Sequence, residues 1–190
     1  MRIVGGKHRG RPLAVPEGKA VRPTSDRARQ ALFNILEHGP FAAEGSPLRE
    51  RRVLDAFAGT GALGLEALSR GAAHAVFLEN APASLAVLHT NIAKLGESAR
   101  TTVCRADASA PGRALVPCDL ILLDPPYGAG LGAPALAALQ RQGWFNPQAL
   151  IVLETACREE FTAPPPFTLV QERVYGAARL IFLRVGMGRE

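Results

Sequence analysis

The stretch VLDAFAGTGALGLEAL, from Val53 to Leu68, sets the fold class of this chain. Apolar residues lead to Asp55, three glycines follow in the spacing G-x-G-x-x-G, and an apolar, helix-forming run comes after them. This order is typical of a strand that turns through a tight loop into a helix. Glycine lets the backbone of such a loop approach other groups closely. We therefore expect the first strand of a parallel sheet here, with a ligand site at its carboxyl end.

Strand and helix patterns alternate from Arg52 onward. We expect strands at VLDAF, HAVFLE, ARTTVCRAD, DLILLD and ALIVLE, and helices over 61–70, 82–95 and 133–142. The segment after the third strand is expected to be short and helical or irregular. PFTLVQERVYG and AARLIFLRVG follow with no helix between them and predict a hairpin. The sequence thus predicts an α/β fold: a seven-strand sheet, mostly parallel, with a C-terminal antiparallel hairpin and helices on both faces.

The residues before this sheet are short, basic and rich in turns. RIVGG and RPLAVP predict a small β-hairpin, and Arg22-Pro23-Thr24-Ser25 opens a helix that HGP at 38–40 ends. Residues 39–51 are expected to be a linker. Residues 1–29 carry a net charge of +6, whereas the rest of the chain carries −1. Such a segment favours phosphate groups, although charge alone fits a solvated tail equally well.

Length and composition exclude several classes of protein. A chain of 190 residues with 47% hydrophobic residues fits one domain with a sizeable core. No apolar run approaches the roughly 20 residues of a membrane span, and no signal-peptide core follows the N-terminus. Cys104, Cys118 and Cys157 show no pairing or metal-ligand spacing. We expect reduced thiols in a cytosolic protein that holds no metal.

The glycine loop alone leaves its ligand open. Glu79 ends the next strand 20 residues after Gly59, and this spacing also fits a dinucleotide. Asp55 argues against a pyrophosphate, because its charge would repel phosphate at the helix N-terminus. A ligand with a positive amino group and a sulfonium suits it better, and we predict S-adenosylmethionine. The predicted cofactor-binding residues are Asp55, Phe57, Ala58, Gly59, Thr60, Gly61, Glu79, Asn80, Asp107 and Ala108.

Each acidic residue in that set has an assigned role and an alternative. Asp55 and the loop 56–61 are expected to hold the methionine end, Glu79 the ribose, and Asp107 the adenine amino group. Without a ligand, Asp55 would be a helix cap, Glu79 an acid at a surface strand end, and Asp107 a turn residue.

A second motif, DLILLDPPYGAG from Asp119 to Gly130, ends another predicted strand on a carboxylate. Pro125 and Pro126 cannot donate to a ladder, so they end the strand. Asp124 and nearby carbonyls can accept both hydrogens of a planar exocyclic amine, while Tyr127 stacks on its ring. This arrangement favours methyl transfer to that nitrogen. The predicted catalytic residues are therefore Asp124, Pro125, Pro126 and Tyr127; the alternative is a Pro-Pro turn followed by an incidental tyrosine.

Together these motifs make the sequence similar to a known family. The chain resembles the RsmD family of small-subunit ribosomal RNA guanine-N2 methyltransferases, which are class I, Rossmann-like S-adenosylmethionine enzymes. The resemblance covers nearly the whole chain. It is carried in order by RIVGGKHRGRPL, RPTSDRARQALFNIL, LDAFAGTGALGLEALSRGA, LLDPPY and GWFNPQALIVLE.

The resemblance implies a substrate and a division of labour. The target would be the exocyclic N2 of one guanine of 16S rRNA, guanine 966, in an assembled or assembling small subunit. Residues 1–40 would form an RNA-facing extension, and 41–190 the catalytic domain of a cytoplasmic monomer. The RNA-binding residues implied are Lys7, Arg9, Arg11, Arg22, Thr24 and Arg27.

Four other functions remain open from the residues alone. A DNA adenine-N6 methyltransferase uses the same chemistry but usually carries a target-recognition domain. A protein glutamine methyltransferase leaves the basic N-terminal segment unexplained, and a nicotinamide-binding protein leaves Asp55 and the DPPY motif unexplained. A non-catalytic RNA-binding module would not need S-adenosylmethionine, so cofactor binding would separate it from an enzyme.

Overall fold

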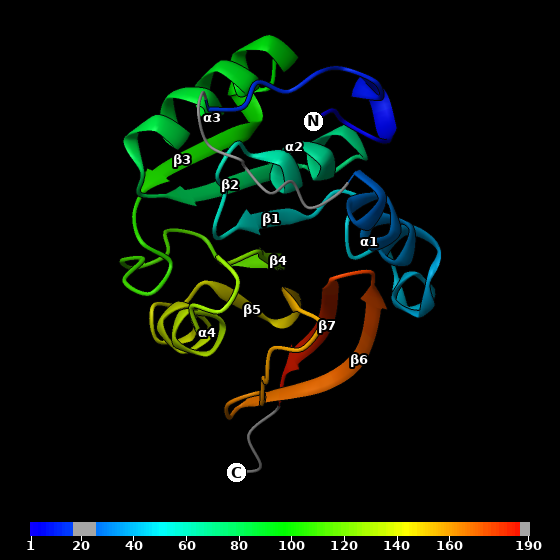
Figure 1. Cartoon of the computed structure of the whole chain (residues 1–190), viewed down its shortest axis with the longest axis vertical. Coiled ribbons are helices and arrows are strands. Elements are labelled where there is room, and N and C mark those ends of the chain that lie inside the picture. Colours follow the sequence, from blue (N-terminus) through cyan, green and yellow to red (C-terminus); the bar gives the residue numbers. More distant parts are fainter. Residues whose placement is uncertain (17–25, 187–190) are drawn as a thin grey trace.

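The computed structural model describes residues 1–16 and 26–186, and its centre is one sheet of seven strands (Figure 1). The strand order is β3-β2-β1-β4-β5-β7-β6. The first five strands are parallel, whereas β7 runs antiparallel to both β5 and β6. The α/β fold with a mostly parallel seven-strand sheet and an antiparallel C-terminal hairpin is thereby confirmed. The strands are β1 Arg52–Asp55, β2 His74–Glu79, β3 Thr101–Arg105, β4 Cys118–Leu123, β5 Phe145–Ala156, β6 Phe167–Tyr175 and β7 Ala178–Val185.

Helices cover both faces of the sheet, as expected. The α-helices are α1 Asp26–His38, α2 Ala62–Ser69, α3 Pro82–Leu95 and α4 Gly132–Arg141; shorter 3-10 helices are η1 Gly6–His8, η2 Pro40–Glu44 and η3 Ser98–Arg100. One buried cluster joins the sheet to α1, α2 and α3, and a second joins the other face to α4. None of the helices in the described ranges is long and apolar enough to cross a membrane.

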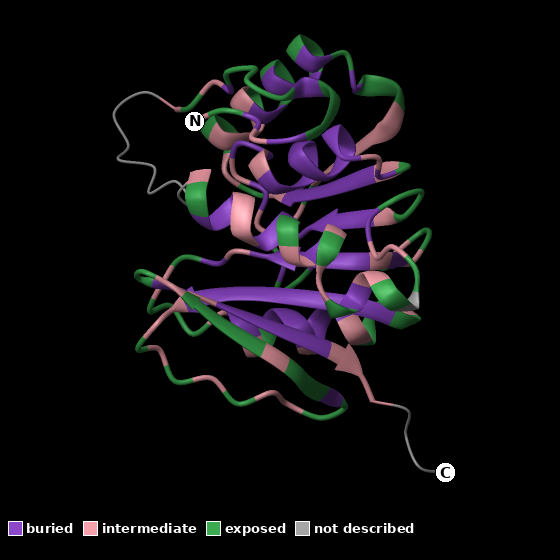
Figure 2. Cartoon of the chain, turned by 90° about the vertical axis from the view of Figure 1, so that its right-hand side faces the viewer, coloured by how far each residue is buried: buried purple, intermediate pink, exposed green. Residues whose placement is uncertain are grey.

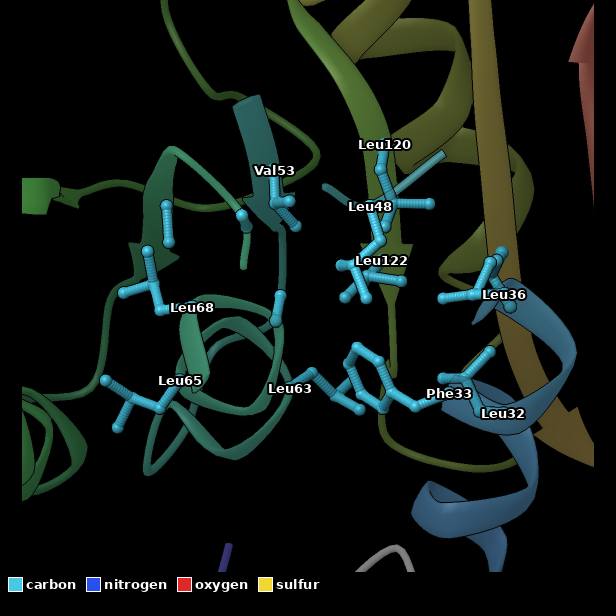
Figure 3. Packing of buried hydrophobic residues seen from close by; sticks show 14 of the residues in the cluster. Leu32, Phe33, Leu36, Leu48, Val53, Leu63, Leu65, Leu68, Leu120 and Leu122 are labelled. Carbon is cyan, nitrogen blue, oxygen red and sulfur yellow. The ribbon is translucent and has the colours of Figure 1, made fainter. Parts of the chain in front are cut away.

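The core is formed by the central strands and the helices that pack on the two faces of the sheet. Leu32, Phe33 and Leu36 of α1 face Leu120 and Leu122 of β4 (Figure 3). Burying each such side chain contributes about 1.5–3 kcal/mol. The edge strand β6 is mostly exposed, in contrast to the buried central strands (Figure 2).

Two strands differ in length from expectation. The first strand ends at Asp55 rather than two residues later, because the chain there already turns into the glycine loop. Residues 106–117, between β3 and β4, contain no helix, which confirms the irregular form of the two that were expected for this connection. The strand expected at ALIVLE is longer, because β5 begins at Phe145 beside β4 and continues to Ala156 beside β7.

The expected N-terminal hairpin is present but short: beside an antiparallel bridge between Arg2 and Pro12, the Ile3 amide donates to Arg11 at 3.0 Å and the Leu13 amide to Met1 at 3.1 Å, and neither segment continues as a regular strand. The ladder stops because nearby amides donate to side chains instead. The Val4 amide donates to Glu66 of α2 at 2.8 Å, and the Ala14 amide donates to Asn91 of α3 at 2.7 Å. Residues 1–16 therefore pack against α2 and α3.

Helix α1 is described from Asp26, so the expected helix opening at Arg22–Ser25 lies outside the described residues. The helix ends at His38, as the HGP sequence predicts. The expected linker contains η2, where Phe41 stacks on Phe182 of β7 with ring centroids 5.1 Å apart. This segment is thus anchored to the sheet.

Candidate active site

A pocket of about 1100 Å³ opens at the carboxyl ends of the central strands. The loops after β1, β2, β3 and β4 line one part of it. The start of α1, Glu154 of β5 and the turn between β6 and β7 line the rest. Carboxyl ends of parallel strands are where sheets of this kind bind ligands.

The strand-end carboxylates do not all reach this pocket, because they lie at different levels of the sheet. Asp55 on β1 is paired in register with Phe77 on β2 and with Leu122 on β4. Glu79 and Asp124 each lie two residues beyond those partners. They therefore reach the rim and line the pocket, whereas Asp55 lies one side-chain level below it.

Asp55 is 1% exposed and does not line the pocket. Its Oδ2 accepts a hydrogen bond from the Gly64 amide of α2 at 2.9 Å, so it caps the first turn of that helix. Its Oδ1 is buried without a hydrogen-bond partner. Burial, with the nearby charges of Asp124 and Glu79, raises the pKa of Asp55 to about 7. A cation above this oxygen would stabilise the ionised form.

The glycine loop is fixed by Glu79. One carboxylate oxygen accepts the Gly59 amide at 2.8 Å, and the other accepts the amides of Asn80 and Ala81 at 2.8 and 2.7 Å. Glu79 thus joins the loop after β1 to the loop after β2. Phe57, Gly59, Glu79 and Asn80 line the pocket, whereas Ala58, Thr60 and Gly61 are buried behind it.

Asp107 and Ala108 line the same side of the pocket. The carboxylate of Asp107 accepts hydrogen bonds from the side chain and amide of Ser109 at 2.5 and 2.7 Å and from Asn80 at 3.0 Å. These bonds, those from Ser109 first, hold the pKa of Asp107 below its usual value. The side chain is therefore an ionised acceptor at the pocket rim.

Asp124, Pro125, Pro126 and Tyr127 all line the opposite side of the pocket. The Tyr127 hydroxyl donates to Glu154 on β5 at 2.6 Å. Glu154 also lines the pocket, and sequence reasoning missed it. The run ALIVLE indicates only a strand, and no spacing motif links its glutamate to DPPY.

The turn between β6 and β7 is a second contribution that the sequence did not reveal. Residues 174–178 line the pocket from this turn. Val174 is 60% exposed, so it presents an accessible apolar side chain to the pocket that the DPPY residues also line. The hairpin was expected, but its position over the site depends on how β7 pairs with β5.

The predicted RNA-binding residues do not form one group. Arg27 of α1 is exposed and lines the pocket, whereas Lys7, Arg9 and Arg11 do not. Arg11 donates to the Lys94 carbonyl near the end of α3 at 3.3 Å. Arg22 and Thr24 lie outside the described residues.

Lys7 contacts a buried carboxylate that does not line the pocket. Its amine lies 2.7 Å from Glu97, which also contacts His8 and Arg100, both at 2.6 Å. Burial opposes ionisation of Glu97, yet hydrogen bonds from Lys7, His8 and Arg100 outweigh it and hold its pKa below the usual value. Lys7 therefore attaches the N-terminal segment to the end of α3.

Comparisons with known proteins identify the family of this chain. The family model Conserved hypothetical protein 95 matches residues 1–184. Ribosomal RNA small subunit methyltransferase D of Escherichia coli is 37% identical over 177 residues, which cover 93% of this chain and 85% of that protein. The protein of the same name in Haemophilus influenzae is 33% identical, with 93% and 89% covered.

Solved structures agree as well. The Escherichia coli protein yhhF superposes with a TM-score of 0.81 at 35% identity and covers 98% of each chain. A hypothetical protein from Thermus thermophilus gives 0.75 at 32% identity, with 97% and 99% covered. The chain therefore belongs to the RsmD family and has the fold of the class I methyltransferases, as its motifs predict.

Proposed function

We propose that this chain transfers a methyl group from S-adenosylmethionine to the exocyclic N2 of one guanine in small-subunit ribosomal RNA, in the cytoplasm. One observation carries the proposal: a single pocket is lined by the glycine loop with Glu79 on one side and by Asp124–Tyr127 on the other. A methyl donor and a planar amine could therefore meet in it. The names of the relatives support ribosomal RNA as the substrate.

The residues present fit the proposed cofactor. The unpartnered Oδ1 of Asp55 lies beneath the glycine loop and suits a positively charged methionine end. Glu79 at the strand end suits the ribose hydroxyls, and Asp107 with Ala108 suits the adenine. When bound, the cofactor would supply an electrophilic methyl group on a sulfonium.

The DPPY residues would prepare the amine. A guanine amine is a poor nucleophile because its lone pair is delocalised into the ring. Asp124 and the Pro125 carbonyl would accept its two hydrogens, which exposes the lone pair and stabilises the positive charge that develops. The Tyr127 ring would hold the base in line with the donor. After transfer, one amine proton leaves to water.

Arg27 would contact the RNA backbone. It lies at the start of α1, exposed and on the wall of the same pocket. A guanidinium in this place suits a phosphate next to a base that has left its stack.

A tritium-transfer assay tests the proposal. Labelled S-adenosylmethionine is incubated with the protein and with small subunits that lack guanine-N2 methylation, with naked 16S rRNA and duplex DNA in parallel. We expect label in N2-methylguanosine from the subunits. Label in N6-methyladenine, or none in any nucleic acid, would overturn the substrate.

A further inference from the structure

Glu154 and Asp124 lie side by side at the rim of the pocket. Leu122 of β4 is paired in register with Val152 of β5, and Asp124 and Glu154 each lie two residues further along. Neighbouring strands are about 4.8 Å apart, and paired residues point to the same face. Two carboxylates thus project from adjacent strands toward the site proposed for the target base.

Glu154 is a buried carboxylate that accepts a hydrogen bond from the Tyr127 hydroxyl. Glu154 is 4% exposed, and burying a carboxylate is costly unless hydrogen-bond donors surround it. The Tyr127 hydroxyl requires only an acceptor, which an uncharged glutamine would also offer. A carboxylate provides about four acceptor positions, so it can accept from Tyr127 and from a ligand at the same time.

The base proposed as the target offers a suitable donor. In guanine the amine that Asp124 would hold lies next to the ring N1–H, which is a hydrogen-bond donor. In adenine, and in 2-aminopurine, the ring N1 carries a lone pair and no hydrogen. A carboxylate beside Asp124 would accept the N1–H of guanine and repel the N1 lone pair of adenine or 2-aminopurine.

We propose that Glu154 determines specificity for guanine by accepting the N1–H of the target base, while the Tyr127 hydroxyl orients its carboxylate. This inference rests on the proposed function. It also fixes how the base enters, because the ring nitrogen on the other side of the amine, N3, carries a lone pair that Glu154 would repel.

The test compares guanine with 2-aminopurine, which keeps the exocyclic amine but lacks the N1–H. Small subunits are reconstituted from 16S rRNA that carries either base at the target position, and initial transfer rates are measured. Wild-type protein should prefer guanine strongly. Glu154→Gln should reduce this preference about 10- to 100-fold, because the glutamine amide can donate to the N1 of 2-aminopurine.

Two variants serve as controls. Tyr127→Phe keeps the Glu154 carboxylate but removes the hydroxyl that orients it, so it should lower the preference for guanine less than Glu154→Gln does. Glu159→Gln alters an acid that accepts the Gly128 amide at 3.2 Å but does not line the pocket, and it should keep the wild-type preference. Cofactor affinity by calorimetry confirms that each variant is folded.

The outcomes separate the two proposals. If wild-type protein methylates guanine and Glu154→Gln keeps the full preference over 2-aminopurine, the role of Glu154 is wrong and the proposed function stands. If wild-type protein transfers no label to guanine, the proposed function fails, and the inference fails with it.

Discussion

Asp55 accepts a hydrogen bond from the Gly64 amide at 2.9 Å, and its other carboxylate oxygen is buried without a partner. The same side chain thus holds the first turn of α2 and retains acceptor capacity beneath the glycine loop. Because burial raises its pKa to about 7, its charge changes within the physiological range. A cationic ligand above it would be bound to the ionised form.

Cofactor affinity should therefore depend on pH through Asp55. Protonation competes with the ligand, so the affinity of wild-type protein for S-adenosylmethionine should increase as pH rises through about 7 and then level off. In Asp55→Asn the affinity should be about 10- to 100-fold weaker at pH 8, and it should no longer increase as pH rises through about 7. Calorimetry across the pH range measures both, and identical pH profiles for the two proteins would contradict the role.

The same variant should have the opposite effect on stability. The pKa of Asp55 is higher in the folded state than its unfolded value of 3.8, so the folded state loses stability as pH rises from about 3.8 to about 7 and no further above that. An asparagine oxygen can still accept the Gly64 amide. Asp55→Asn without ligand should therefore be more stable than wild type at pH 8, by about 1–3 kcal/mol, and this gain should shrink toward pH 5. Urea unfolding at both pH values measures it; an unchanged difference would contradict the buried charge.

Alanine substitutions at two glycines of the loop should affect different properties, stability in one case and cofactor binding in the other. A Cβ at Gly64 would lie 2.3 Å from the Phe77 ring, so Gly64→Ala should lower the free energy of unfolding by about 1–3 kcal/mol. Gly59 faces open space at a positive φ of 52° and lines the pocket. Gly59→Ala should mainly weaken cofactor binding, with a smaller loss of stability. Equal losses of stability in urea unfolding would contradict this distinction.

Arg27 and Lys7 should differ in their effect on RNA. Arg27→Ala should weaken binding to small subunits and reduce the slope of log K against log salt by about one phosphate contact. Lys7→Ala is the matched control, because the Lys7 amine pairs with Glu97 and does not line the pocket. Its slope should stay at the wild-type value. A larger change for Lys7 than for Arg27 would place the RNA on the N-terminal segment instead.

The fold could be predicted from the sequence because the patterns that indicate its strands and helices are local. The apolar run at 74–79, the helix from Pro82 to the αL glycine Gly96, and the glycine loop each depend on neighbouring residues. Whether a strand-end carboxylate reaches the pocket depends instead on the register between strands that are distant in sequence. For this reason the spacing could suggest Asp55 as a pocket residue, whereas pairing with Phe77 places it one level lower.

Glu154 shows the same limit. It is separated from Tyr127 by 27 residues, and only the pairing of β4 with β5 brings the two together. The basic N-terminal segment shows a second limit of prediction from sequence. Net charge indicated a phosphate partner for the segment as a whole, but it could not distinguish Arg27 at the pocket from Lys7 at a buried carboxylate.

The central claim is that one pocket joins a cofactor half to an amine half, and Asp124→Ala tests it most directly. Methyl transfer to small subunits and cofactor affinity are measured on the same protein. We expect transfer to fall at least about 100-fold while cofactor affinity stays within about tenfold, because Asp124 acts on the target amine. A wild-type transfer rate, or a loss of cofactor affinity that accounts for the whole loss of transfer, would contradict the account.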